Sequence, residues 1–173
     1  MAEVVAYLET HGLAGLSLRP LAAELGTSAR MLVYYFGTKE NLVAQAVAAS
    51  RADGAGRLAE VTSIDGVRAA MLAQWQQMTT GREHGHATLV AQVISLAATD
   101  PDRYGTLAIE ALEGAIDPLV SALVRAGTPK AAARQRATIL VSGLRGLLQD
   151  GAATGDRRRV NAAAKTLIDL VLA

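Results

Sequence analysis

The stretch TSARMLVYYFGTKENL, residues 27 to 42, places three side chains with hydrogen-bond donors close together: Arg30, Tyr34 and Lys39. A guanidinium, a phenol and an ammonium can each donate to a phosphate oxygen or to the edge of a base. Lys39 also stands where a helix is expected to begin, so its ammonium and the free backbone amides there can bind one phosphate together. The spacing therefore predicts contact with a nucleic acid.

Three consecutive aromatic residues in this stretch separate into two groups when they are placed on a helix. With 3.6 residues per turn, Tyr35 and Phe36 lie on the side of Leu32, whereas Tyr34 lies about 200° from Leu32. We expect Tyr35 and Phe36 to pack inward and Tyr34 to face outward. The outward ridge of this helix then consists of Ala29, Arg30, Val33 and Tyr34.

The rest of the chain offers little catalytic or metal-binding chemistry. It has no cysteine and no Gly-x-Ser-x-Gly, His-Glu-x-x-His or phosphate-loop motif. His84 and His86 are two residues apart, so they point to opposite sides of a helix, and no third ligand is near in sequence. We expect a protein that is not an enzyme and that uses neither a cofactor nor a metal.

The elements that position these groups are all predicted to be helices. Apolar residues make up 51% of the chain and recur at helical spacing, without the alternation of a strand. The fold class is therefore all-α, with a three-helix head that contains a helix-turn-helix and a body of five or six longer helices. No apolar run is long enough to span a membrane or to act as a signal peptide, so a cytoplasmic protein without a membrane partner is expected.

Two short helices joined by a tight turn are predicted before residue 37. Ser17 and Ser28 are suited to cap the two helices, and Gly26 can take the left-handed conformation that ends the first one. Such a pair is a helix-turn-helix, whose second helix can enter a DNA major groove. Thr38 is expected to cap the next helix, which runs from Lys39 to about residue 54 and connects the head to the body.

The sequence LETHGLAGLSLRPLAAELGTSARMLVYYFGTKENLVAQAV contains glycines at 12 and 26, Ser28, a Tyr-Phe pair and a Lys39-Glu40 step. In these features and in its hydrophobic phasing, the region from 4 to 50 resembles the DNA-binding head of the TetR family of bacterial repressors. The resemblance implies a homodimer that binds a palindromic double-stranded DNA operator and is released by a small-molecule effector. It also implies that DNA backbone contacts come from Ser17, Arg19, Ser28, Tyr34 and Lys39, and contacts nearer the bases from Ala29, Arg30 and Val33.

The head also departs from this family pattern. Val33 stands where relatives often carry a tyrosine, and Arg30 stands where glycine is common. The first helix is about one turn shorter and lacks a preceding basic arm, as expected of a truncated or misassigned start. Residues 1 to 51 contain four basic and four acidic residues, so the head is neutral overall. These departures leave an alternative open, namely a helical small-molecule-binding dimer whose head has lost sequence-specific DNA binding.

The resemblance further implies domain limits and a dimer interface. Residues 1–50 would form the DNA-binding domain, and residues 51–173 would bind the effector and dimerise through the last two helices. Apolar stripes on these helices and glycines that allow close approach predict an interface made by Leu140, Gly143, Leu144, Leu147, Val160, Ala164, Leu167 and Val171. The other interpretation of the stripes is that they complete the core of a monomer.

An effector pocket is expected among the helices between the head and the interface. Its candidate lining combines adaptable apolar side chains with polar groups on apolar stripes: Met71, Trp75, Met78, His86, Tyr104 and Glu113. The same residues have a simpler interpretation, in which the apolar ones are core, His86 is a hydrogen-bonded buried imidazole and Glu113 is surface.

Overall fold

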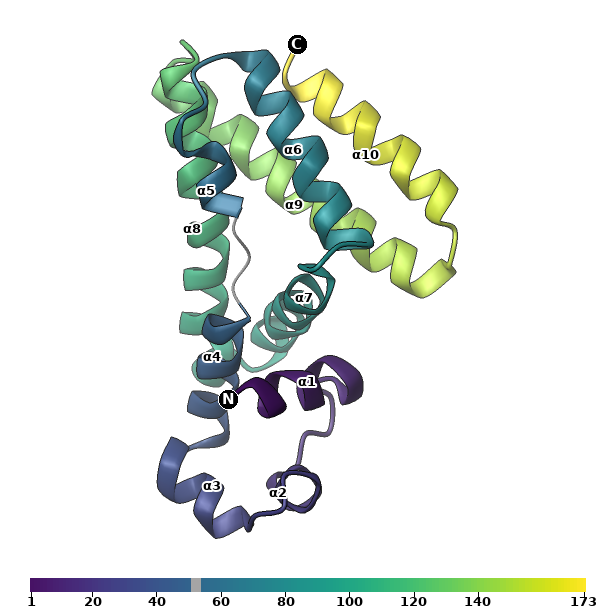
Figure 1. Ribbon diagram of the computed structural model, residues 1–173. Helices are drawn as coiled ribbons and strands as arrows, with labels where there is room; N and C mark the ends of the chain where they lie inside the picture. The colour runs from purple at the N-terminus through teal and green to yellow at the C-terminus, as the bar shows by residue number, and fades with distance from the viewer. Residues whose placement is uncertain (51–53) are drawn as a thin grey trace. The chain divides into compact units, whose positions relative to one another are not determined.

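The computed structural model describes residues 1–50 and 54–173, and within these ranges all regular secondary structure is helical (Figure 1). The helices are α1 (Ala2–His11), α2 (Leu18–Glu24), α3 (Ala29–Phe36), α4 (Lys39–Ala49), α5 (Gly54–Ala59), α6 (Ile64–Thr79), α7 (His84–Thr99), α8 (Pro101–Arg125), α9 (Lys130–Thr154) and α10 (Arg157–Val171). The all-α prediction is therefore confirmed. No helix in the described ranges is both long enough and apolar enough to cross a membrane.

The described chain divides into two compact units, which we treat separately. The first unit contains α1 to α4 together with the segment 85–109, which comprises nearly all of α7 and the start of α8. Its core is made of aliphatic side chains with little or no exposure, including Leu8, Leu21, Leu42, Leu89 and Val93. The head is thus built on α7, and not on its own three helices alone.

Specific polar contacts fasten the first unit. The amide of Leu13 donates to Gln92 Oε1 at 2.5 Å, and Ser50 Oγ lies 3.1 Å from His86 Nδ1. Both contacts join the segment that contains the head to α7. Gly12, beside Leu13, has a φ of 73°, and a Cβ there would lie 2.9 Å from Gln92 Oε1. Glycine is therefore required at position 12 both by its backbone conformation and by the closeness of Gln92.

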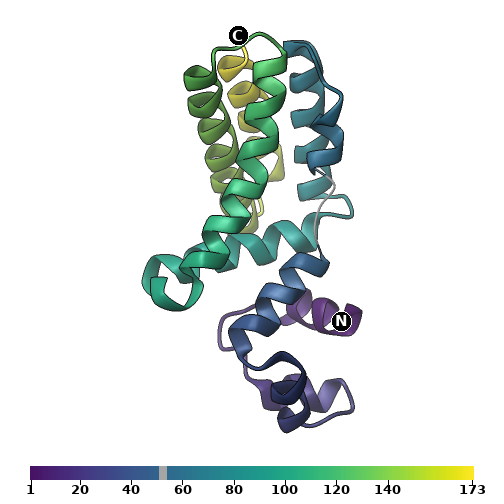
Figure 2. The same cartoon turned by 90° about the vertical axis from the view of Figure 1, so that its left-hand side faces the viewer.

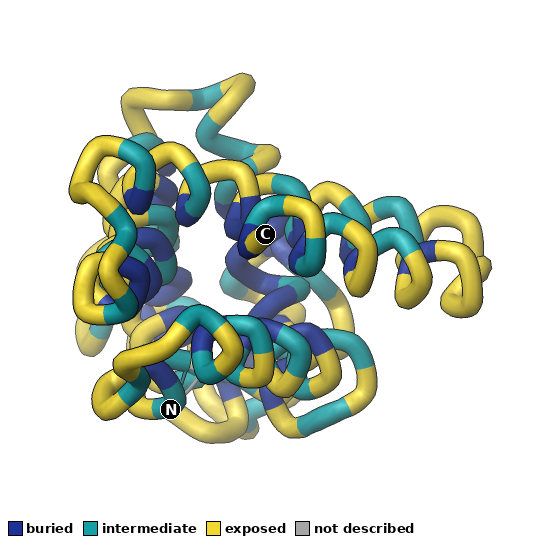
Figure 3. The backbone as a smooth tube through the Cα atoms, turned by 90° about the horizontal axis from the view of Figure 1, so that it is seen from above, coloured by how far each residue is buried: buried dark blue, intermediate teal, exposed yellow. Residues whose placement is uncertain are grey.

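The second unit contains α5, α6, the rest of α8, α9 and α10. In it α6, α9 and α10 contact one another (Figure 2). Buried positions lie on the inner sides of these helices and exposed positions on their outer sides, as amphipathic helices require (Figure 3). Fully buried side chains such as Val67, Leu123, Leu140 and Ile168 form its core.

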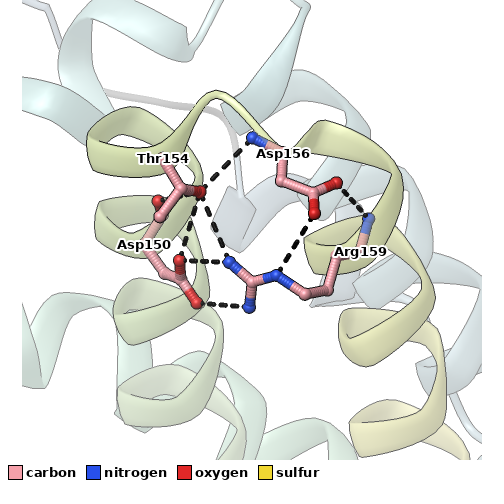
Figure 4. Close-up of polar contacts among 4 residues, drawn as sticks. All are labelled: Asp150, Thr154, Asp156 and Arg159. Atoms are coloured by element: carbon pink, nitrogen blue, oxygen red, sulfur yellow. Dashed lines mark hydrogen bonds and ion pairs between the residues drawn. The ribbon is translucent and has the colours of Figure 1, made fainter.

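The turn between α9 and α10 is closed by an ion-pair network (Figure 4). Both oxygens of Asp150 accept hydrogen bonds from the Arg159 guanidinium, at 2.6 and 2.8 Å. These bonds hold the pKa of the Asp150 carboxyl below its usual value. Asp156 caps α10 by accepting from the Arg159 amide at 3.1 Å, and Gly155 ends α9 in the left-handed conformation. The antiparallel α9–α10 pair is therefore fixed by local contacts at its connection.

The structure differs from the sequence-based expectations at several helix ends. α9 continues through Gly151 and ends at Thr154, and Gly155 then takes the left-handed conformation. A short helix, α5, was not expected. α4 ends at Ala49, and the expected continuation to about residue 54 falls partly on residues 51–53, which lie outside the described residues.

Candidate nucleic-acid interface

The turn between α2 and α3 follows from the residues that form it. Gly26 has a φ of 64°, and the Thr27 amide donates back to the Ala22 carbonyl at 2.9 Å, which satisfies the end of α2. Ser28 then accepts a hydrogen bond from the Met31 amide at 3.2 Å and caps α3. The predicted helix-turn-helix is therefore present.

The outward side of α3 is unusually apolar for a surface. Val33 is 47% exposed and Tyr34 is 77% exposed, and Met31 is partly exposed as well. Arg30 lies among them and is also exposed. Only Leu32 of this helix is buried, and Phe36 is half-buried. Leu32 and Phe36 thus anchor this eight-residue helix to the head. Its exposed side carries the guanidinium of Arg30, the aliphatic side chain of Val33 and the phenol of Tyr34.

The residues predicted to contact DNA all lie in this region of the first unit. Six are exposed: Ser17, Arg19, Ser28, Arg30, Val33 and Tyr34. Ala29 and Lys39 are half-buried. The Lys39 ammonium donates to the Leu16 carbonyl at 3.4 Å, so it ties α4 to the loop before α2. In this conformation Lys39 also stabilises the head itself.

The predicted inward position of Tyr35 is wrong. Tyr35 is 68% exposed, and its ring meets the ring of Tyr34 edge-on with centroids 5.4 Å apart. On the helical wheel Tyr35 lies at the margin of the inward side, and α2 and α4 cover only the centre of that side, where Leu32 and Phe36 lie. Tyr35 therefore belongs to the exposed surface of α3. In the sequence, only its position directly after Tyr34 indicated that the two rings could lie together.

The acidic residues of the head are partly offset by basic neighbours. Glu40, beside Lys39, pairs with Arg103 at 3.0 Å, and Glu24 lies 3.9 Å from His11. Arg103 belongs to α8 and so was not part of the charge count of the head. Glu40 is therefore partly compensated from outside residues 1 to 51, although Arg103 also lies 3.6 Å from Asp100.

The candidate effector residues do not form a single group. Met71, Trp75, Met78 and Glu113 belong to the second unit, whereas His86 and Tyr104 belong to the first. Met71 and Trp75 are buried, Met78 is half-buried and Glu113 is exposed. Burial raises the pKa of the Tyr104 hydroxyl, and the nearby Glu40 carboxylate adds to the effect. The indole of Trp75 donates to Asn161 Oδ1 at 2.8 Å, so its polar group is already satisfied within the second unit.

The candidate dimer residues fall into two classes. Leu140, Leu144, Val160 and Ala164 are buried within one chain, where α9 contacts α10. Their surface is already covered, so they join these two helices to each other. The remaining four are half-buried: Gly143, Leu147, Leu167 and Val171.

The outer side of α9 and α10 carries two larger exposed side chains that were not among the predicted interface residues. Ile139 is 50% exposed and Leu170 is 72% exposed. A Cβ on Gly143 would lie 2.5 Å from Leu167 Cδ2, so Gly143 lets α9 and α10 approach closely within the chain. We call Ile139, Gly146, Leu167 and Leu170 the outer α9–α10 face.

Comparisons with known proteins agree with this geometry. The family described as bacterial regulatory proteins, tetR family, matches residues 5–46. A transcriptional regulator from Rhodococcus sp. Rha1 has a similar structure, with a TM-score of 0.77 and 24% identity over 99% of this chain and 92% of that one. A TetR transcriptional regulator from Legionella pneumophila has a TM-score of 0.78 and 17% identity, over 99% and 96% of the two chains. No curated protein is similar enough to match. These two structures establish the fold, and the family match shows that residues 5–46, which contain the helix-turn-helix, are similar to the domain described as bacterial regulatory proteins, tetR family.

Proposed function

We propose that the protein is a repressor that binds a palindromic DNA operator as a homodimer and releases it when a small molecule binds the body. The observation that carries this proposal is the exposed ridge of α3, on which Arg30, Val33 and Tyr34 project from a helix with only one buried side chain. Large exposed apolar groups on a short helix mark a contact surface. A DNA major groove accommodates such a helix, with thymine methyl groups for the apolar side chains and acceptors for the polar ones.

Binding by two heads follows from the size of this ridge. A single short helix reaches few base pairs, and helix-turn-helix proteins reach specific affinity as dimers whose half-sites lie about 34–36 Å apart. The outer α9–α10 face supports a dimer, because Ile139 and Leu170 expose aliphatic surface on adjacent helices. Two helices from each chain would form a four-helix contact around a two-fold axis.

Release by a small molecule requires that the molecule bind two conformations of the dimer with different affinity. The long helices of the second unit are the expected site, and Met71, Trp75, Met78 and Glu113 remain candidates there. His86 and Tyr104 remain candidates within the first unit. We keep the domain limits proposed from the sequence, with residues 1–50 for DNA binding and residues 51–173 for effector binding and dimerisation. These limits describe function along the sequence, whereas in the fold α7 packs with the head.

The test is operator selection from random duplex DNA with the full chain, followed by affinity measurements at several salt concentrations. The proposal predicts a palindromic consensus and a steep fall of affinity with salt, because phosphate contacts release counterions. The alternative of a head that no longer binds specific sequences predicts no enrichment over random DNA even at low salt. Metabolite screening against the selected duplex then tests release.

A further inference from the structure

Arg145, in the middle of α9, is a half-buried cation whose hydrogen-bond partners in the described chain include no carboxylate. Its Nη2 donates to the Ala111 carbonyl of α8 at 3.3 Å. Its Nη1 is buried and has no hydrogen-bond partner among the described residues. Both residues belong to the second unit. The guanidinium is therefore held by one neutral acceptor at the long end of the hydrogen-bond range.

Several other arginines that contact neighbouring helices have anionic partners, whereas the exposed Arg125 donates only to the backbone carbonyls of Leu58 and Val61. Arg57 pairs with Glu83, Arg68 with Asp169 at 2.7 Å, and Arg159 with Asp150 at 2.6 Å. Even the largely exposed Arg134, three turns before Arg145 on α9, pairs with Asp117. Arg145 has no such carboxylate among the described residues, although it is less exposed than Arg125.

Partial burial also affects the proton affinity of Arg145. It lowers the pKa of the guanidinium, and no charged neighbour contributes to the shift. An arginine nevertheless stays protonated at neutral pH, so this half-buried side chain keeps its charge. The buried Nη1 is a donor without an acceptor, which opposes folding unless something pairs with it.

The surroundings of Arg145 indicate what kind of anion would fit. One turn away on α9 stand Val141 and Leu148, both buried. On α8, Leu112 follows Ala111 directly, and Ile116 is buried just beyond it. A carboxylate on an apolar skeleton suits these apolar neighbours better than a free inorganic anion does. The planar guanidinium also matches a carboxylate through two parallel hydrogen bonds.

We propose that Arg145 is the anion-binding group of the effector site and that the effector is a carboxylate with an apolar skeleton. Its role as an effector site rests on the proposed function, whereas the binding itself does not. A bound carboxylate competes with the Ala111 carbonyl for the guanidinium and so changes a contact between α8 and α9. This competition supplies a difference between the free and bound conformations on which a ligand can act.

The test compares carboxylates with uncharged analogues of the same shape. Sodium benzoate and sodium octanoate are titrated into the full chain at constant ionic strength, with benzamide and octanamide as controls, by calorimetry and thermal unfolding. Wild type should bind at least one carboxylate and should bind its amide at least tenfold more weakly. Arg145→Gln should lose at least tenfold in carboxylate affinity. Arg134→Gln, which removes an exposed arginine from the same helix, should bind like wild type.

Two results would overturn the inference. One is the absence of any preference for carboxylates over amides in wild type, and the other is equal carboxylate affinity in wild type and Arg145→Gln. If Arg145→Gln does not fold, Arg145→Met serves instead, because it keeps an unbranched chain and removes the charge. Arg145→Met should unfold at a higher temperature than wild type without ligand and show no carboxylate-induced shift. A lower unfolding temperature together with an unchanged carboxylate response contradicts the proposal.

Operator binding is measured in parallel to separate this inference from the proposed function. Operator binding without carboxylate preference refutes the Arg145 site and leaves the function standing. Carboxylate binding without any operator supports the site and refutes the function. Carboxylate binding that leaves a bound operator in place refutes the effector role of the site.

Discussion

The indole Nε1 of Trp75 on α6 donates a 2.8 Å hydrogen bond to Oδ1 of Asn161 on α10, and Trp75 is only 6% exposed. This is the one tryptophan of the sequence, so its fluorescence reports on this helix contact alone. Asn161 is exposed, so Asn161→Ala removes the acceptor of a part-buried hydrogen bond and should destabilise the protein by about 0.5–1.5 kcal/mol. Urea unfolding followed by tryptophan fluorescence measures the loss. Asn161→Asp keeps an oxygen acceptor and should lose less; an alanine variant with the wild-type midpoint would show that the bond contributes nothing.

Gly12 offers a test of the contact between the head and α7. Gly12→Ala places a Cβ 2.9 Å from Gln92 Oε1, which accepts from the Leu13 amide. Gly15 has nearly the same φ, 74° against 73°, but a Cβ there would meet no atom within 4 Å, so Gly15→Ala isolates the backbone cost. That cost should be about 1–2 kcal/mol. Gly12→Ala should cost about 1 kcal/mol more, because the Gln92 hydrogen bond is displaced.

Removal of the obstructing side chain provides the check on Gly12. The double variant Gly12→Ala with Gln92→Ala should be destabilised by less than the sum of the two single variants. Both single substitutions remove the same Gln92 hydrogen bond, so this loss is counted only once in the double variant. Denaturant unfolding of the single and double variants gives the coupling energy. Strict additivity would mean that Gly12 and Gln92 do not act through each other.

We expect the protein to dimerise through the outer α9–α10 face. Leu170→Glu puts a charge on a side chain that is 72% exposed in one chain, so it should leave the fold of that chain unchanged and dissociate the proposed dimer. Light scattering coupled to gel filtration should show a dimer for wild type and a monomer for the variant at low micromolar concentration. Val124→Glu, at a 43% exposed valine of α8, is the matched control and should remain dimeric. A wild-type monomer would contradict the assembly.

Asp169 makes part of the stability dependent on pH. Hydrogen bonds from Lys165 and then Arg68, each 2.7 Å, lower the pKa of the Asp169 carboxyl below 3.8. A carboxyl with a lowered pKa in the folded state stabilises the protein above its unfolded pKa, and this contribution is lost as pH falls through the folded pKa. Asp169→Asn should therefore lower the unfolding temperature at pH 7, and the difference should shrink below a pH of about 4.

Asp65 is the control for this pH dependence. It also faces Arg68, but at 3.9 Å and with a side chain that is 98% exposed. Solvent screens such a pair, so Asp65→Asn should change the unfolding temperature much less at every pH. Equal effects of the two substitutions at pH 7 would refute the importance of the Asp169 contacts.

The helix-turn-helix could be predicted from the sequence because local residues determine it. Gly26 and Ser28 supply the helix end and the cap through contacts within a few residues, and Thr38 does the same for α4 by accepting from the Asn41 amide at 3.1 Å. Helical phase also placed Tyr34 outside correctly. A helical wheel gives the direction of a side chain but not how much of that side neighbouring helices cover. For this reason Tyr35 was wrongly predicted to be buried.

Contacts between distant segments could not be predicted in the same way. The stripes of α9 and α10 look alike whether they face each other or a second chain, so periodicity did not reveal that Leu140 and Ala164 are buried within one chain. The pairing of Glu40 with Arg103 joins residues far apart in sequence, and the lack of a partner for Arg145 among the described residues is equally a property of the folded chain. Such features depend on tertiary structure, which single residues do not encode.

The most direct test of the α3 ridge is the affinity of Tyr34 variants for the selected operator, measured by fluorescence anisotropy at fixed salt. Tyr34→Ala should weaken binding about tenfold or more, as expected for a lost hydrogen bond to a charged phosphate, while circular dichroism and the oligomeric state stay unchanged. Ile109→Ala, at a 57% exposed residue of the same compact unit, should bind like wild type. Wild-type operator affinity in folded Tyr34→Ala would contradict the assignment of this ridge to DNA.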